Sequence, residues 1–253
     1  MDSFDYIITD LNNTISVFKS YALNHPVSGN SYSEFEDFFR SDILLNRTYH
    51  SCIITNFSPF FTLLPKNLYK ASEKDLYLEQ VAELGTRYQV DDERMSALGS
   101  VSVFAVHQFL MGWSKNRFKQ HRKSHIINSL IKMAHLEEYQ ASPDRLFLYR
   151  SGHHMAVCLI KKGLLHFVNI FEIPIPEQLV YYIGLMISQF QLSQLDTKVY
   201  FVSGFDKGND YYDSLKLYLP DVHTASLPKG ITLAPNLKTA PKNQLLVPAV
   251  GLL

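Results

Sequence analysis

The chain has 253 residues, of which 46% are hydrophobic and 13% aromatic, a composition typical of globular proteins and unlike that of disordered ones. Its 24 Lys and Arg residues balance 24 Asp and Glu residues, so the formal net charge is zero and no overall field attracts nucleic acid or an anionic membrane. The two cysteines, Cys52 and Cys158, lie in apolar, strand-like runs, which is typical of buried, reduced cysteines inside the cell.

The sequence predicts neither an export signal nor a membrane span. It begins MDSFDYIITD, which is acidic where a secretory signal carries Lys or Arg before an apolar stretch. Elsewhere a charge or a glycine breaks each apolar run well before the ~20 residues that a membrane-spanning helix needs. We therefore expect a cytoplasmic protein.

The first half of the chain predicts a mixture of strands and helices. A hairpin is expected within residues 5–21, a helix near 34–45 and a strand at 50–55. The apolar run FTLLP (61–65), a polar helix at 73–83, a strand at 100–106 and a helix from His107 follow. One apolar helical stripe comes next, formed by Ile126, Ile127, Leu130, Ile131 and Ala134.

The second half shows a clearer pattern. Three strand-length runs, 146–151, 154–160 and 164–171, follow one another, and Lys162-Gly163 is a hairpin turn signal between the last two. Pro174 and Pro176 then introduce an amphipathic helix, whose apolar face is predicted to bury Leu179, Ile183, Met186 and Phe190. A strand at 198–203, a helix at 211–219 and a short strand near Val222 complete the half.

The order in the second half is therefore strand, strand, strand, helix, strand, helix, strand, and the first half is a blurred version of it. We expect an α/β protein with two similar halves, residues 1–140 and 141–225. The boundary lies near Ser142-Pro143-Asp144, which marks a turn. The last segment, 226–253, carries Pro228, Pro235, Pro241 and Pro248 and is expected to be extended on the surface.

Three segments carry a family resemblance: FTLLPKNLY (61–69), KKGLLHFVNIFEI (161–173), and QLVYYIGLMISQFQL followed by VYFVSG (178–204). They resemble a bacterial family of unknown function whose members are similar in fold to actin-like ATPases. The resemblance covers about residues 45–225 and implies a duplicated actin-like ATPase (ribonuclease H-like) fold, with the two halves flanking a cleft. By fold analogy, the nearest understood relatives are cytoplasmic docking platforms of pilus assembly and type II secretion.

In an actin-like fold, an Asp-x-Gly turn in each half holds the phosphates and the metal ion of ATP. The corresponding turn of the first half reads Asp10-Leu11-Asn12-Asn13, with asparagine where glycine belongs, and it also suits an ordinary hairpin. The turn of the second half reads Arg150-Ser151-Gly152-His153 and contains no aspartate. Arg150 and His153 are suited to an anion but not to magnesium.

The loop that would take the adenosine reads Ser203-Gly204-Phe205-Asp206-Lys207-Gly208. The pattern has a glycine pair after the strand, and only one glycine stands where the pattern wants it. A strand-to-helix connection needs glycine for its geometry alone, so a purely structural role stays open. The candidate ligand-binding residues are therefore Asp10, Asn12, Arg150, Ser151, Gly152, His153, Ser203, Gly204, Asp206 and Gly208. We expect no cofactor and no metal ion, apart from a vestigial ATP/Mg site.

Two other patterns are weaker. His121 and His125 have the spacing of helical neighbours that share a metal ion, yet no carboxylate or cysteine nearby completes the set. The stretch 115–125 is basic, and Trp113 and Phe118 offer stacking surfaces, but such runs are usually solvated faces, so nucleic acid is not expected as a partner. The motifs of P-loop, Rossmann, α/β-hydrolase and zinc-protease sites are missing from the sequence.

These observations favour a non-catalytic actin-like binding or scaffold protein with a degenerate nucleotide cleft and a protein or peptide partner. One alternative is an ATP-dependent enzyme or ATPase that uses Asp10 and Asp206. Another is a docking module in envelope or pilus-type assembly. The cleft is predicted to bind an anion or a peptide without magnesium.

Overall fold

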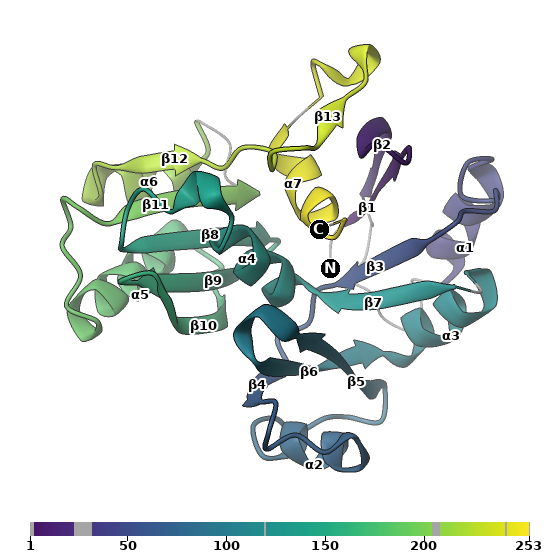
Figure 1. The fold of residues 1–253 in the computed structure, drawn as a ribbon, viewed down its shortest axis with the longest axis horizontal. Helices are drawn as coiled ribbons and strands as arrows, with labels where there is room; N and C mark the ends of the chain where they lie inside the picture. The colour runs from purple at the N-terminus through teal and green to yellow at the C-terminus, as the bar shows by residue number, and fades with distance from the viewer. Residues whose placement is uncertain (1–2, 23–31, 119, 204–207, 241, 253) are drawn as a thin grey trace. The chain divides into compact units, whose positions relative to one another are not determined.

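The structure is a computed structural model, and it describes residues 3–22, 32–118, 120–203, 208–240 and 242–252 (Figure 1). The chain forms two compact units. Unit 1 comprises Met1–Ala22 and Ser129–Leu253, and unit 2 comprises Leu23–Asn128. This division differs from the boundary near residue 140, because the N-terminal residues pack with the second half of the chain.

Unit 1 contains a five-stranded sheet in the order β10-β9-β8-β11-β12. Strands β8, β9 and β10 are antiparallel neighbours, whereas β11 runs parallel to both β8 and β12. Helix α5 joins β10 to β11, and helix α6 joins β11 to β12. The bounds are β8 Arg145–Ser151, β9 His154–Lys161, β10 Leu164–Glu172, α5 Pro176–Gln189, β11 Lys198–Ser203, α6 Asp210–Tyr218 and β12 Val222–Thr224. The predicted element order of this half is confirmed.

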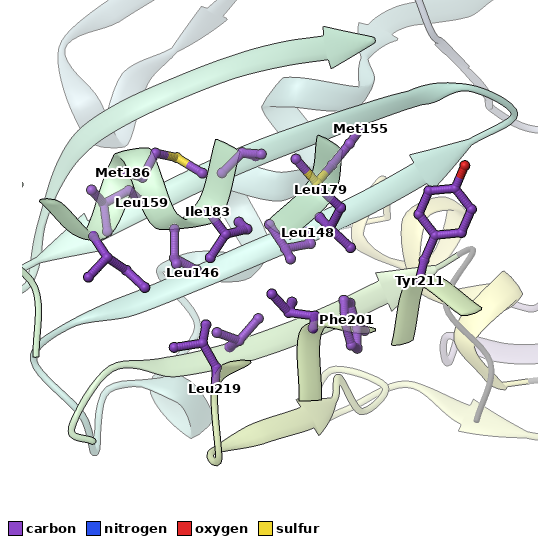
Figure 2. Packing of buried hydrophobic residues seen from close by; sticks show 14 of the residues in the cluster. Leu146, Leu148, Met155, Leu159, Leu179, Ile183, Met186, Phe201, Tyr211 and Leu219 are labelled. Carbon is purple, nitrogen blue, oxygen red and sulfur yellow. The ribbon is translucent and has the colours of Figure 1, made fainter. Parts of the chain in front are cut away.

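Helices α5 and α6 cover one face of this sheet and enclose its main core (Figure 2). Leu148 and Phe201 of the sheet, Leu179 and Ile183 of α5, and Leu215 of α6 are all buried in it. The three-and-four spacing on α5 explains this packing, because it places the apolar side chains on one helix face. Phe190 differs from the prediction: it lies one residue past the helix and is half-buried, because the helix ends at Gln189.

The other face of the sheet is also covered, which explains why β9 reads as a continuous apolar run. Phe147 and Cys158 point away from the α5 side and are fully buried. The Tyr139 ring packs edge-on against Phe147 and Tyr200, with centroids 5.1 and 4.8 Å away. Helix α7 (Lys242–Val250) contacts β11.

The N-terminal hairpin and the C-terminal segment form a second, three-stranded sheet in unit 1. Strand β1 (Ser3–Thr9) pairs antiparallel with β2 (Thr14–Ala22), and β13 (Thr232–Leu233) adds to β2 in parallel. Helix α7 contacts β1, and Leu245, Leu246 and Ala249 are fully buried. The expectation of an extended segment over 226–253 is therefore wrong for 242–250. A helix with Pro248 inside it looks extended from composition alone.

Unit 2 contains the parallel pair β3-β7 and the antiparallel sheet β4-β6-β5. Its helices α1, α2 and α3 were expected, although α2 is shorter than predicted. The bounds are α1 Tyr32–Ser41, β3 Cys52–Asn56, β4 Phe61–Pro65, α2 Lys74–Glu79, β5 Tyr88–Met95, β6 Ser100–His107, α3 Gln108–Arg117 and β7 His121–His125. Helix α4 (Ile126–Ala134) follows β7, and its stripe is buried as predicted.

Candidate functional site

The β1–β2 turn uses its aspartate to hold its own backbone. Asp10 Oδ1 accepts the backbone N–H groups of Asn12 (2.9 Å) and Thr14 (2.8 Å). Asn13 adopts a left-handed conformation, with φ 59°, which asparagine tolerates better than most residues. The side chain of Asn12 is exposed. This is the geometry of a hairpin turn closed by a side chain, and it does not reproduce a glycine turn that cradles phosphate.

The β8–β9 turn consists of Gly152 and His153. Gly152 has φ +56°, so glycine suits this turn for conformational reasons. His153 is exposed, and its carbonyl oxygen accepts the N–H of Ile173. The turn therefore helps to hold the chain where it leaves the sheet toward α5.

Arg150 lies at the end of β8, with its guanidinium carbon 3.9 Å from the centroid of the Tyr211 ring. Tyr211 is buried in the first turn of α6, and its hydroxyl donates to the carbonyl oxygens of Ile173 (3.0 Å) and Pro174 (2.9 Å). The ring is thus fixed in place, and it holds a positive charge beside the start of α6 by a cation–π contact.

The carboxyl ends of β8 and β11 bring several candidate residues together. Ser203 of β11 pairs with Tyr149, which precedes Arg150. The sheet order changes direction here, since β9 and β10 lie on one side of β8 and β11 and β12 on the other. Open α/β sheets bind ligands at such a switch point.

The connection from β11 to α6 is described only in part, because Gly204 and Asp206 lie outside the described residues. Gly208 has φ +83°, a conformation that favours glycine. Asn209 follows and caps α6, its side-chain oxygen accepting the N–H of Tyr211 (3.0 Å). Asp10 and Asn12 belong to the other sheet of unit 1, and the hydrogen bonds of the Asp10 side chain stay within its own turn.

Two contacts of the candidate turns were not predicted. The sequence pattern places Tyr211 in a helix but does not predict its contact with Arg150. Asn209, a residue type that favours helix N-caps, is the sequence signal that places Tyr211 in the first turn of α6. Thr232 of the C-terminal segment donates its backbone N–H to the carbonyl oxygen of Asn13 (3.2 Å). No local pattern links these two residues, because they lie at opposite ends of the chain.

The histidine pair does not have the geometry that the sequence suggested. His121 and His125 lie on strand β7 and not on a helix, so their spacing does not make them neighbours. Within the described ranges, no group of three or more His, Cys, Asp or Glu side chains is arranged to hold a metal ion. The His125 side chain is fully buried, with Nε2 2.9 Å from the carbonyl oxygen of Ser58, and burial lowers its pKa to about 4.

Two basic residues of the stretch 115–125, Arg117 and Lys123, are engaged in contacts within the protein. Arg117 donates to the carbonyl oxygen of Leu45 and to the side chain of Asn46. Lys123 forms a 2.8 Å ion pair with Asp91, and both side chains are mostly buried. These contacts do not favour a nucleic-acid surface.

Two solved structures resemble this chain over most of its length. One is a protein from Bacteroides thetaiotaomicron with an actin-like ATPase fold and unknown function, at 16% identity and a TM-score of 0.74, covering 88% of this chain and 87% of that one. The other belongs to the PilM–PilN type IV pilus biogenesis complex, at 14% identity and a TM-score of 0.60, covering 99% and 93%. The chain is thus a mixed α/β protein with the actin-like ATPase fold.

Residues 1–222 match a family model, and the chain belongs to that family, which is described as proteins of unknown function (DUF3822). A comparison with curated proteins finds no match. No helix in the described part of the chain is long and apolar enough to span a membrane.

Proposed function

We propose that this protein is a non-catalytic binding or scaffold protein, in which the nucleotide site of the actin-like fold has become a docking site. The observation that carries the proposal is that a carboxylate oxygen of Asp10 already accepts two backbone N–H groups of its own turn. In the second turn, Arg150 stands near the position that suits an aspartate. Neither turn then offers the pair of carboxylates and open glycines that magnesium and phosphate require.

The proposal includes the duplication and the cleft. We propose two similar halves that flank a cleft in a cytoplasmic protein, a reading that the fold resemblance supports. The candidate residues Asp10, Asn12, Arg150, Ser151, Gly152, His153, Ser203, Gly204, Asp206 and Gly208 would line it.

The ligand we propose is an anion or an acidic peptide, bound without a metal ion. Arg150 offers a guanidinium beside the first turn of α6, and Ser151 and Ser203 add hydroxyl groups. Guanidinium and hydroxyl donors suit carboxylate or phosphate oxygens. They are poor ligands for a hard divalent cation, which prefers oxygen anions and carbonyls.

We propose that a partner protein carries the carboxylate or phosphate group that binds here. The PilM–PilN structure, in which a related fold occurs in a complex for type IV pilus biogenesis, supports docking in an envelope or pilus-type assembly. The rival function is that of an ATP-dependent enzyme or ATPase that relies on Asp10 and Asp206, and it requires tight, magnesium-dependent nucleotide binding.

Calorimetric titration with ATP, phosphate and an acidic peptide, with and without magnesium, tests the proposal. We expect at least one anion to bind equally well in both conditions, with affinity reduced about tenfold or more by Arg150→Ala. Lys216→Ala, which removes an exposed charge from the last turn of α6, is the control and should leave binding unchanged. Magnesium-dependent binding that Asp10→Asn abolishes, or turnover near ~1 s⁻¹, would establish the rival.

A further inference from the structure

The C-terminal segment occupies the edge of β2 next to the candidate turn of the N-terminal hairpin. The N–H of Thr232 donates to the carbonyl oxygen of Asn13 (3.2 Å), and the N–H of Ala234 donates to that of Ile15 (2.9 Å). The hydroxyl groups of Thr232 and Thr14 lie 3.1 Å apart in a hydrogen bond. Strand β13 lies beside β2 in unit 1 (Figure 1).

A short apolar contact accompanies these hydrogen bonds. Ile15 is fully buried, and it packs with Ile231 of the C-terminal segment and with Ala249 of α7. Leu233 is partly buried in the same cluster. The segment is thus recognised as an extended peptide is, through backbone groups and alternate side chains.

The pairing is limited to two residues by the structure on either side of it. Before it, the N–H of Ile231 bonds to the carbonyl oxygen of Pro228 in a turn that places Gly230 at φ +85°. After it, a 3-10 helix begins at Pro235. Strand β2 itself continues to Ala22, so β13 pairs with only the first part of the strand.

We propose that the edge of β2 is a docking site for an extended peptide segment of a partner protein, and that residues 231–234 of this chain occupy it as an intramolecular competitor. The partner segment we infer is apolar–Thr–apolar, like Ile231-Thr232-Leu233, and pairs with β2 in parallel. This inference rests on the proposed docking function and names the class of partner. The family model ends at residue 222, so β2 lies in the matched part and its occupant lies outside it.

Tethering explains how so short a strand holds the edge. A segment linked to its own site acts at an effective concentration on the order of millimolar, so that modest interactions keep it bound. Here these are two backbone hydrogen bonds together with the apolar contacts of Ile231 and Leu233. A partner segment lacks this advantage, but it is free of the flanking turn and 3-10 helix and gains affinity by pairing with more of β2. Loosening the tethered segment should therefore raise the affinity for a peptide.

The variant Ala234→Pro in the full-length protein tests this. Ala234 has φ −60°, which proline adopts without strain. The substitution removes the hydrogen bond to Ile15, and its ring carbon replaces the hydrogen and pushes the segment away from β2. Ala234→Gly keeps the N–H group and is the matched control. The probe is a fluorescent peptide of residues 227–238, LPKGITLAPNLK, titrated by anisotropy against both variants and the unchanged protein.

We expect Ala234→Pro to bind the peptide about fivefold or more tightly than the unchanged protein, and Ala234→Gly to resemble the latter. Thr14→Ala, combined with Ala234→Pro, removes a hydrogen-bonding hydroxyl from the site and should bind the peptide more weakly than Ala234→Pro alone. In the unchanged protein, excess peptide should speed hydrogen exchange at the Thr232 and Ala234 amides, a readout that does not depend on how the proline variant folds.

Equal binding by the proline and glycine variants, no binding to any of them, or binding that leaves those amides protected would overturn the inference. The peptide carries no anionic side chain and needs no magnesium, so these outcomes remain separate from the anion titrations. Anion binding through Arg150 without peptide binding would leave the proposed function standing and remove only the role of β2.

Discussion

At the scale of single residues, several polar side chains of this protein form hydrogen bonds with the backbone around them. Asp10 holds the N-terminal turn, Asn209 caps α6, and Arg145 donates to the carbonyl oxygens of Ser142 and of Ala134, the last residue of α4. Arg145 is almost fully buried, and burial lowers its pKa. A cation at a helix C-terminus offsets part of that cost through the helix dipole. Of these three residues, Asp10 is a candidate ligand-binding residue in the sequence, yet its side-chain hydrogen bonds hold its own turn.

The role of Asp10 can be tested through stability. Asp10→Ala removes the acceptor of two turn amides and should cost about 1–2 kcal/mol in the free energy of unfolding, measured with urea. Asp10→Asn retains an acceptor oxygen and should lose clearly less. Asn12→Ala, in the same turn, should change little, because the Asn12 side chain is exposed. If the unfolding free energy is the same in all three variants, Asp10 does not hold the turn.

His125 predicts a pH dependence of stability. Ile127 N–H lies 3.4 Å from Nδ1, and Nε2 lies 2.9 Å from the carbonyl oxygen and 3.3 Å from the backbone nitrogen of Ser58, so the neutral ring suits its surroundings. Burial lowers the pKa to about 4, although Ser58 and Glu93 both act to raise it. Between pH about 6.5 and 4 the unfolded chain binds a proton that the folded chain does not, so the free energy of unfolding decreases as the pH is lowered.

The loss amounts to roughly 3 kcal/mol across this window, and it should be absent above pH about 7. Urea unfolding at several pH values measures it. His125→Gln removes the titrating group, so the slope of the unfolding free energy between pH 6.5 and 4 should decrease in that variant. An unchanged slope would assign the effect to other groups.

At the scale of elements, the second half was predictable because each signal there is local. The apolar runs of β8, β9 and β10, the proline entry of α5 and the strand β11 each specify a structure without reference to the rest of the chain. Strands β5 and β7 were missed for the opposite reason. Their sequences, YQVDDERM and HRKSH, carry charges that an isolated strand would expose. Contacts with residues distant in sequence accommodate these charges: Lys123 pairs with Asp91, and Glu93 accepts hydrogen bonds from Ser124 and Asn128.

Helix α5 offers a matched pair of substitutions. Ile183 is fully buried, whereas Leu185 on the same helix is 48% exposed. Ile183→Ala should therefore cost about 2–5 kcal/mol in chemical denaturation, since it removes apolar contacts and leaves a cavity. Leu185→Ala should stay within about 0.5 kcal/mol. Comparable losses from the two variants would mean that the helix is rotated from this orientation.

At the scale of the whole molecule, the two ends of the chain meet in unit 1. The hairpin β1–β2, strand β13 and helix α7 share the cluster around Ile15, although more than half of the sequence separates them. No local sequence pattern predicts such a contact, and the prolines of the C-terminal segment favour an extended chain over a packed helix. This large separation in sequence also explains why the sequence predicts the two candidate turns but does not predict that the C-terminal segment pairs with the N-terminal hairpin.

The packing of α7 links the two ends energetically, and hydrogen exchange in the full-length protein can measure this link. Leu246 is fully buried in α7, which contacts β1 and β11. Leu246→Ala should lower the protection of backbone amides in β1 and β2, because the hairpin loses part of its cover. Gln244→Ala, at an exposed position of the same helix, is the control. Amides of β6 belong to unit 2 and should keep their protection, since that sheet has its own core around Val101 and Val103. Uniform loss across both units would show that the chain unfolds as one cooperative body, whereas unchanged exchange in β1 and β2 would show that the hairpin is stable without α7.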